Sequence, residues 1–172
     1  MKTSIKIFVI AMCLFAFNAV SAQTAQKFGH IESNKLMAIM PEMKAAQADL
    51  QKKATEFETQ IKSMRGEYEK LIQAYQAGEK TMSDIVKQAK IKEIQDAEQR
   101  IQLFSQHAQQ TLQKSKEEMI KPVIEKANNA IKAVGSEQGF IYIFDLSAGN
   151  ILYHSSKSVD IFPLVKKKLG IQ

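Results

Sequence analysis

The fold is decided by residues 36–75, which read LMAIMPEMKAAQADLQKKATEFETQIKSMRGEYEKLIQAY. Apolar residues recur in this stretch at alternating steps of four and three, with one polar member, Gln47. The series is Leu36, Met40, Met43, Gln47, Leu50, Ala54, Phe57, Ile61, Met64, Tyr68, Leu71 and Tyr75. A spacing that averages about three and a half residues keeps one side of an α-helix against a partner helix along its whole length. The stretch therefore predicts a long helical rod, which has no pocket of its own and favours a mechanical or binding role.

A second helix is predicted to return alongside the first. Gly78 suits a left-handed helix C-terminus, and Ser83 suits the N-cap of the next helix, with Asp84 in its first turn. The returning helix carries its own apolar series, Ile94, Ala97, Ile101, Phe104, Ala108 and Leu112. Pro41 and Pro122 are expected to break or kink the helices where both reach a common body.

The N-terminal flank of the rod carries a strand pattern. Residues 27–32 form a short strand candidate with Phe28 and His30 on one face. Ser33 or Asn34 is expected to cap the helix that follows, because a short polar side chain can accept from its free N–H groups.

The C-terminal flank predicts a strand hairpin and a closing helix. A second helical register, from Ile120 to Val134, is expected to end at Gly135. Residues 139–145 are apolar on both faces, which is typical of a buried strand, and residues 151–154 are expected to return beside it. Residues 160–169 predict a final helix with three lysines in its last turn.

The first residues have the pattern of a secretory signal peptide. Lys2 and Lys6 precede a short apolar run, and Val20-Ser21-Ala22 offers small residues for cleavage. The run is shorter than the roughly 20 residues that a membrane anchor needs. Cys13 is the single cysteine and lies in this leader, so the mature chain has no disulfide or cysteine metal site.

The sequence therefore predicts a mainly α protein with a small β body. Residues 1–22 form the signal peptide, residues 23–40 and 121–172 an α/β body, and residues 41–120 a projecting antiparallel coiled-coil hairpin. Three strands make a thin core for so much apolar mass, and the surplus favours burial against other copies of the chain. The residues assigned to this body interface are Phe28, Ile31, Phe140, Tyr142, Phe144 and Leu152.

Composition and motifs favour binding over catalysis. Loss of Lys2 and Lys6 from the 24 basic residues, against 18 acidic ones, leaves a net charge of about +4. This mild charge suits acidic partners or an anionic lipid surface, and export argues against nucleic acid. The 3 histidines lack metal-ligand spacing, although His30 and His154 lie in segments that could be neighbours. No phosphate loop or catalytic triad is suggested, so we expect no enzyme activity, metal or cofactor.

The order of these parts resembles the Skp (OmpH) family of periplasmic chaperones over essentially the whole mature chain. The segments that carry the resemblance are Gly29–Leu36, Met82-Ser83, Gly139–Asp145, Val159–Ile161 and Pro163–Lys166. Phe162 departs from the family, which often has a Ser or Thr cap there, and the hairpin tip lacks a strongly basic cluster.

The resemblance implies a homotrimer whose bodies form an intersubunit β-barrel and whose hairpins surround a cavity. The resemblance also implies that residues 23–40 and 121–172 form the trimerisation body and that unfolded outer-membrane β-barrel proteins are held in the cavity, in the periplasm and without ATP. Off-seam apolar residues are the candidates for client contact, namely Ile72, Met82, Ile91 and Leu103. The alternative is an exported coiled-coil structural or adaptor protein that binds one folded partner.

Overall fold

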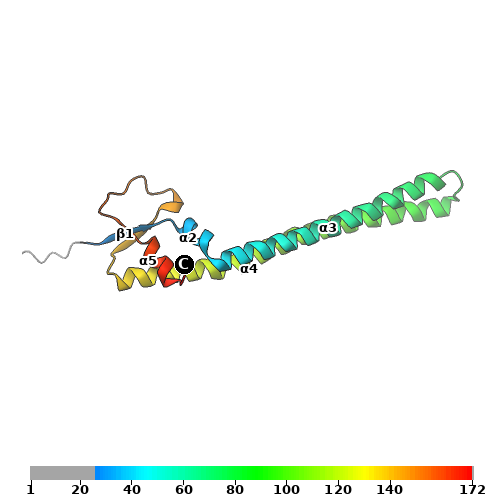
Figure 1. Cartoon of the computed structure of the whole chain (residues 1–172). Coiled ribbons are helices and arrows are strands. Elements are labelled where there is room, and N and C mark those ends of the chain that lie inside the picture. Colours follow the sequence, from blue (N-terminus) through cyan, green and yellow to red (C-terminus); the bar gives the residue numbers. More distant parts are fainter. Residues whose placement is uncertain (1–25, 172) are drawn as a thin grey trace, which may run out of the picture.

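The structure is a computed structural model that describes residues 26–171, and the predicted signal peptide lies outside the described residues. A small body holds both ends of the described chain, and a long arm projects from it (Figure 1). The long helices and the small sheet confirm the predicted mainly helical class. The elements in chain order are β1 (Phe28–Ile31), α2 (Ser33–Ile39), α3 (Pro41–Gly78), α4 (Asp84–Glu137), β2 (Tyr142–Asp145), the 3₁₀ helix η2 (Leu146–Ala148), β3 (Val159–Asp160) and α5 (Phe162–Lys168).

The arm consists of α3 and the antiparallel first part of α4. α3 has 38 residues and is about 57 Å long from the rise of an α-helix. Phe57 of α3 meets Phe104 of α4 edge to face, with 5.9 Å between the ring centroids. Nearer the body, Lys53 Nζ donates to Ser115 Oγ at 3.0 Å. These pairs place the two apolar series against each other along the arm.

The apolar seam of α3 is half-buried over most of its length. All of the predicted seam members from Leu50 to Tyr75 are intermediate in exposure. Gln47 is exposed, and its neighbour Ala46 is buried in its place. Two helices alone cannot enclose the side chains between them, so the arm keeps apolar surface along both sides of its seam.

At the tip of the arm, the backbone conformation of Gly78 differs from the prediction. Gly78 is the last helical residue and is not left-handed. A Cβ at this position would overlap the side chain of Met82, so the glycine is suited to a close approach across the turn. Ser83 occupies the N-cap position of α4 without a side-chain capping bond, and Asp84 lies in the first turn as predicted.

The two prolines at the root of the arm behave differently. Pro41 is the first residue of α3, and the extended Met40 separates it from α2, so the predicted break is confirmed. At Pro122 the predicted restart is wrong, because α4 runs through it without interruption, and the alternative of a kink stays a prediction. An internal proline costs a helix about 3 kcal/mol. Burial of Val123 and Ala127 directly after it offsets that cost by anchoring the helix in the body core.

The end of α4 also lies further on than predicted. The helix continues past Gly135 to Glu137, and Gly139 supplies the positive φ of 69° that turns the chain. Gly135 is instead a buried close-contact position, where a Cβ would lie 3.0 Å from Ile143 Cδ1. Because α4 passes from the arm into the body, the proposed boundary near residue 120 stays a prediction.

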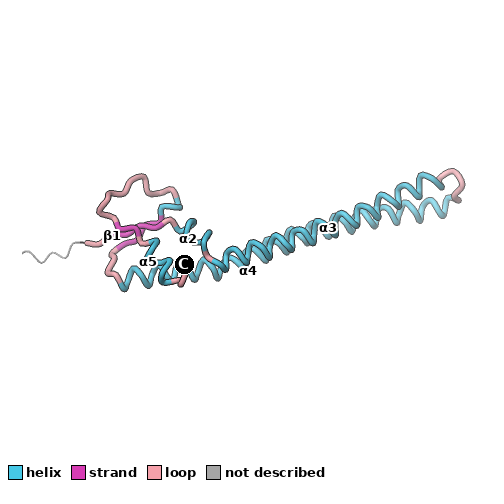
Figure 2. The backbone as a smooth tube through the Cα atoms, viewed as in Figure 1, coloured by secondary structure: helices cyan, strands magenta, loops and turns pink. Residues whose placement is uncertain are grey.

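The body sheet has three parallel strands in the order β2-β1-β3. The predicted hairpin is therefore wrong, because residues 151–154 form no strand and β3 pairs with β1 instead of β2. The segment before β3 crosses over the sheet as a long loop (Figure 2). Its alternating apolar residues Ile151 and Tyr153 line a cavity and do not pair in a ladder, which accounts for the misleading strand pattern.

The body core lies between the inner face of the sheet and the helices. Ile31 is 1% exposed, and Leu36, Met40, Ile161 and Val165 are 0% exposed. Ile143 also packs against this core, whereas Phe28 and His30 lie on the opposite face as predicted. β2 was expected to be a buried strand, with part of its apolar surface covered by other copies, and the single chain covers its inner face. The helices cover one face only, so Tyr142 and Phe144 of β2 remain exposed.

The closing helix is present as predicted but begins at Phe162 and not at Asp160, because Val159 and Asp160 form β3 and pair with β1. α5 has Pro163 in its first turn, and Lys166, Lys167 and Lys168 in its last turn face the negative end of the helix dipole. Gly170 follows with a φ of 70°.

Candidate functional site

The outer face of the sheet carries a row of aromatic side chains. The parallel register sets Phe28 beside Tyr142 and His30 beside Phe144. Phe28 and Tyr142 have ring centroids 6.3 Å apart, and Tyr142 and Phe144 have centroids 6.1 Å apart. The exposed fractions of Phe28, Tyr142 and Phe144 are 36%, 61% and 41%. We call these three residues the aromatic face, and so large an apolar patch is suited to contact with another molecule.

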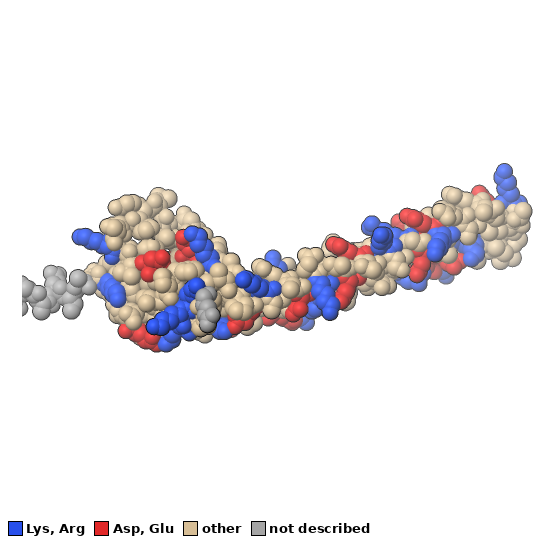
Figure 3. Space-filling view, viewed as in Figure 1, with Lys and Arg blue, Asp and Glu red and all other residues tan. Residues whose placement is uncertain are grey.

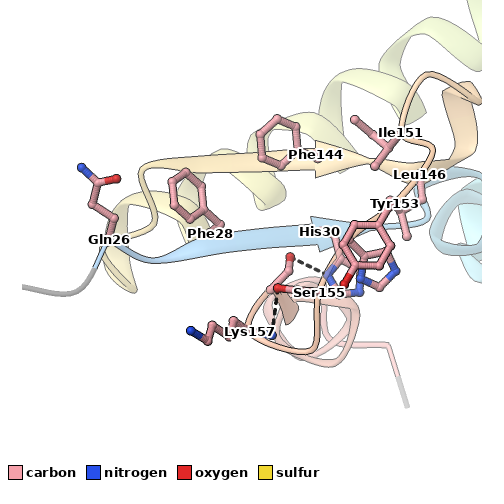
Figure 4. Close-up of a pocket in the computed structure, with 11 residues that line it drawn as sticks. Gln26, Phe28, His30, Phe144, Leu146, Ile151, Tyr153, Ser155 and Lys157 are labelled. Atoms are coloured by element: carbon pink, nitrogen blue, oxygen red, sulfur yellow. Dashed lines mark hydrogen bonds between the residues drawn. The ribbon is translucent and has the colours of Figure 1, made fainter.

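A cavity of about 430 Å³ lies between the outer face of the sheet and the loop of residues 149–158. Phe28, His30 and Phe144 contribute from the strands, and Tyr153 contributes from the loop (Figure 4). His154 of the loop lies against His30, with ring centroids 4.2 Å apart. The predicted proximity of these two histidines is confirmed, although His154 lies in a loop and not in a strand.

The junction of β2 and α2 is fixed by Asp145. Ser33 N–H donates to Asp145 Oδ1 at 3.1 Å, and Ser33 Oγ donates to Oδ2 at 2.5 Å. Ser147 N–H also donates to Oδ1 at 2.9 Å, and Ser147 Oγ accepts from Asn34 N–H at 3.0 Å. The predicted capping by Ser33 or Asn34 is therefore wrong. The free N–H groups of α2 are satisfied by acceptors 112 and 113 residues away in the chain.

The hydrogen bonds at this junction lower the pKa of the Asp145 carboxyl. Partial burial acts to raise its pKa, but the hydrogen bonds from Ser33 and Ser147 outweigh burial and hold the pKa below its usual value of 3.8. The ionised carboxylate is the form that accepts these bonds, so they contribute most to stability when Asp145 is charged.

An exposed ion pair joins the two helices at the root of the arm. Lys126 Nζ of α4 contacts the Glu42 carboxylate at the start of α3. The side-chain hydrogen bond from Lys126 lowers the pKa of Glu42. The pair lies in solvent, so it contributes little to stability and marks the register of the two helices.

The arm surface presents separate apolar side chains among charged ones. Of the four predicted client-contact residues, Ile91 and Leu103 are 41% and 57% exposed, and Ile72 and Met82 are half-buried. Basic and acidic side chains alternate along the face of the arm in Figure 3. The four residues are spread along the arm and do not form one patch.

Sequence reasoning missed two of the most exposed apolar residues. Ile85 and Val86, in the first turn of α4, are 82% and 44% exposed. Their signal was the shift in helical phase before Ile94, since residues off the seam must face solvent or a partner.

The middle of the arm also contains a groove between the helices. This groove of about 590 Å³ includes apolar surface from Met64, Leu71 and Phe104, and charged Lys70 and Arg100. The apolar surface comes from half-buried seam residues, so hairpin packing and a surface for partners share the same side chains.

The six residues assigned to the body interface fall into two groups. Ile31 and Phe140 belong to the protomer's own core, Ile31 as a buried member and Phe140 packed against it. Phe28, Tyr142 and Phe144 form the aromatic face, and Leu152 projects from the loop with 97% of its surface exposed. Tyr153 and Ile141, not singled out in the sequence, are 81% and 51% exposed nearby in the chain.

Residues 26–171 contain no group of three or more His, Cys, Asp or Glu side chains placed to hold a metal ion. None of the helices in the same part of the chain has the length and apolar character required to cross a membrane.

A body with a projecting two-helix arm defines the class of this protein, and comparisons with known proteins identify the family. The family model for outer membrane proteins of the OmpH-like type matches residues 27–169. The chain therefore belongs to the OmpH-like outer membrane protein family. A crystal structure of a candidate outer membrane chaperone (OmpH-like) from Caulobacter crescentus CB15 is similar, with a TM-score of 0.73 and 16% sequence identity. The match covers 86% of each chain, and at this identity it shows a shared fold. No curated protein matches the chain.

Proposed function

We propose that this chain is an ATP-independent periplasmic holdase that keeps unfolded outer-membrane β-barrel proteins from aggregating. Membership of the OmpH-like family supports the proposal. The observation that carries it is the arm, whose exposed apolar residues Ile85, Val86, Ile91 and Leu103 lie on its surface outside the helix seam. A rod of this kind can contact an unfolded chain at many points but has no means to enclose a small molecule.

The arm surface suits weak and exchangeable contacts. Ile85, Ile91 and Leu103 are each at least 41% exposed, and lysines flank Ile91 on both sides in the sequence. Full burial of such a side chain contributes roughly 1.5–3 kcal/mol, and a partial contact contributes less. Several such contacts hold an unfolded chain, while each one breaks readily. Capture and release then follow from binding equilibrium, with no catalytic step or cofactor in the proposal.

The body supports assembly into a homotrimer. Among residues 26–171, β2 pairs with β1 alone, so its other edge has no partner strand in the described part of the chain. The aromatic face lies beside this free edge and is uncovered by the protomer's own helices. Closure of three such sheets into one barrel would pair the free edges and bury the aromatic rings. Three arms rooted in that barrel would border a common cavity for the client.

Client protection provides the direct test. A denatured outer-membrane β-barrel protein is diluted into buffer with the mature chain, and its aggregation is followed by light scattering. We expect suppression at one trimer per client. The double variant Ile91→Ser with Leu103→Ser should require a higher concentration for the same suppression, because two arm contacts are lost.

Leu164→Ser is the matched control, since Leu164 is 36% exposed on α5 of the body and away from the arm. Its suppression should equal that of the native sequence. An absence of suppression by the native chain would contradict the holdase and favour the alternative, a structural or adaptor protein that binds one folded partner.

A further inference from the structure

The loop of residues 149–158 is held to the body by few bonds. We call this segment the cover loop, because it crosses the outer face of the sheet (Figure 2). Among residues 26–171, its backbone hydrogen bonds stay within the loop or reach Leu146, as Ser158 N–H to Ser155 O at 3.0 Å illustrates. A segment with so few backbone bonds to the rest of the protein opens at low free energy unless side chains hold it.

Two histidines provide that side-chain connection. His30 of β1 is half-buried, and His154 of the cover loop is exposed. Their rings lie 4.2 Å apart at an interplanar angle of 31°. His30 Nδ1 also shares a hydrogen bond of 2.9 Å with Ser158 Oγ (Figure 4). Protonated His30 can still donate to Ser158, so the ring-to-ring contact is the one that a change of charge disturbs.

The charged groups around the pair balance one another. Glu32 and Lys35, at the end of β1 and the start of α2, form an ion pair of 2.7 Å. Asp160 of β3 accepts a hydrogen bond from a backbone N–H of α5, and Lys157 of the cover loop lies on the same cavity as the histidines. Tyr153 is the remaining titratable group on that cavity. One imidazolium is compatible with these surroundings, whereas a second would face the first directly.

We propose that the His30–His154 pair holds the cover loop closed while at least one ring is neutral, and that protonation of both rings opens the loop. Imidazole is the side chain that changes charge between about pH 5 and 8, so the test covers that range. Opening removes the loop side of the cavity, which Phe28 and Phe144 line from the strands. The inference goes beyond the proposed chaperone function and does not depend on it.

Hydrogen exchange of the mature chain between pH 8 and pH 5 tests the proposal. The readout is the amide of Ser158, which donates to Ser155 O within the cover loop, and its exchange rate is divided by its intrinsic rate at each pH to give protection. Two unit charges about 4 Å apart repel enough, even in water, to shift an equilibrium about fivefold. We therefore expect protection of the cover loop to fall at least about fivefold. In His154→Phe, a ring without charge replaces the imidazole, and protection should be independent of pH.

His107→Phe is the matched control, because His107 is exposed on the arm. It should keep the native pH response. The proposal is overturned if protection of the native cover loop is constant, or if His154→Phe loses protection as the native sequence does. It is also overturned if the amides of Val123 and Ala127 in the body core lose protection in parallel, since acid would then loosen the whole body.

Discussion

Phe144→Asp is expected to dissociate the proposed trimer. Phe144 keeps 41% of its surface exposed in the single chain. An aromatic side chain offers roughly 200 Å², so about 80 Å² per copy is available to a subunit interface. At ~25 cal/mol per Å², its burial contributes about 2 kcal/mol per copy and about 6 kcal/mol per trimer. This corresponds to roughly 10⁴-fold in the assembly constant, before the cost of dehydrating three carboxylates is added.

The assay is the mass in solution, measured by light scattering after gel filtration, with far-UV circular dichroism as a check of folding. The native sequence should give a trimer mass, and Phe144→Asp should give a monomer of unchanged helix content. Tyr142→Asp, at an even more exposed position of the aromatic face, should behave in the same way.

Leu103→Asp is the control for a carboxylate introduced at an exposed apolar site, since Leu103 lies on the arm. It should remain trimeric. If Phe144→Asp and Tyr142→Asp both kept the trimer mass, the reasoning that places the aromatic face in the interface would be refuted. Dissociation by Leu103→Asp would show that the arms, and not the body, join the subunits.

Three further predictions concern stability. Asp145→Ala should lower the free energy of unfolding by about 1–2 kcal/mol, because the N–H groups of α2 and η2 lose their acceptor; thermal unfolding should show a lower Tm than the native sequence. Because the folded pKa of Asp145 is lowered, its contribution is present above the unfolded value of 3.8 and is lost as pH falls through the folded pKa; the native-minus-variant difference in Tm should therefore shrink as pH falls below 3.8, and a constant difference would contradict this assignment. Gly66→Ala should raise the free energy of unfolding by about 0.5–1 kcal/mol, since nothing lies within 4 Å of the added Cβ; Gly135→Ala, whose Cβ would meet Ile143, should give no such gain in a denaturant titration. Glu42→Gln should leave Tm unchanged, because the Glu42–Lys126 pair is exposed; a clear fall in Tm would show that this pair fixes the arm to the body.

The long-range parts of the fold were harder to predict than the periodic ones. The seam from Leu50 to Tyr75 and the break at Pro41 depend on neighbouring residues, so the sequence shows them directly. The cap of α2 depends on Asp145, which is 112 residues from Ser33. No local pattern contains that pairing. The proline within α4 was misjudged for a related reason, because the packing that compensates for it comes from the body core.

The predicted strand pairing was wrong because an alternating apolar pattern indicates that one face is covered. It does not indicate which strand, if any, lies alongside. Ile151 and Tyr153 alternate as a strand would, yet they line a cavity over the sheet. The true third strand, β3, has only 2 residues, too few for any periodicity. Its position follows from the pairing with Gly29 and His30, which only the folded chain displays.

The exposure of one face of β2 in the single chain bears on assembly. Residues 139–145 are apolar on both faces, a pattern that normally belongs to a strand covered on both sides. One side is covered by Gly135 and the helices, whereas Tyr142 and Phe144 on the other side remain exposed. Exposed rings beside a free strand edge favour aggregation unless another chain covers them. The sequence pattern is therefore consistent with a strand whose second cover comes from a neighbouring copy, which is the contact that Phe144→Asp removes.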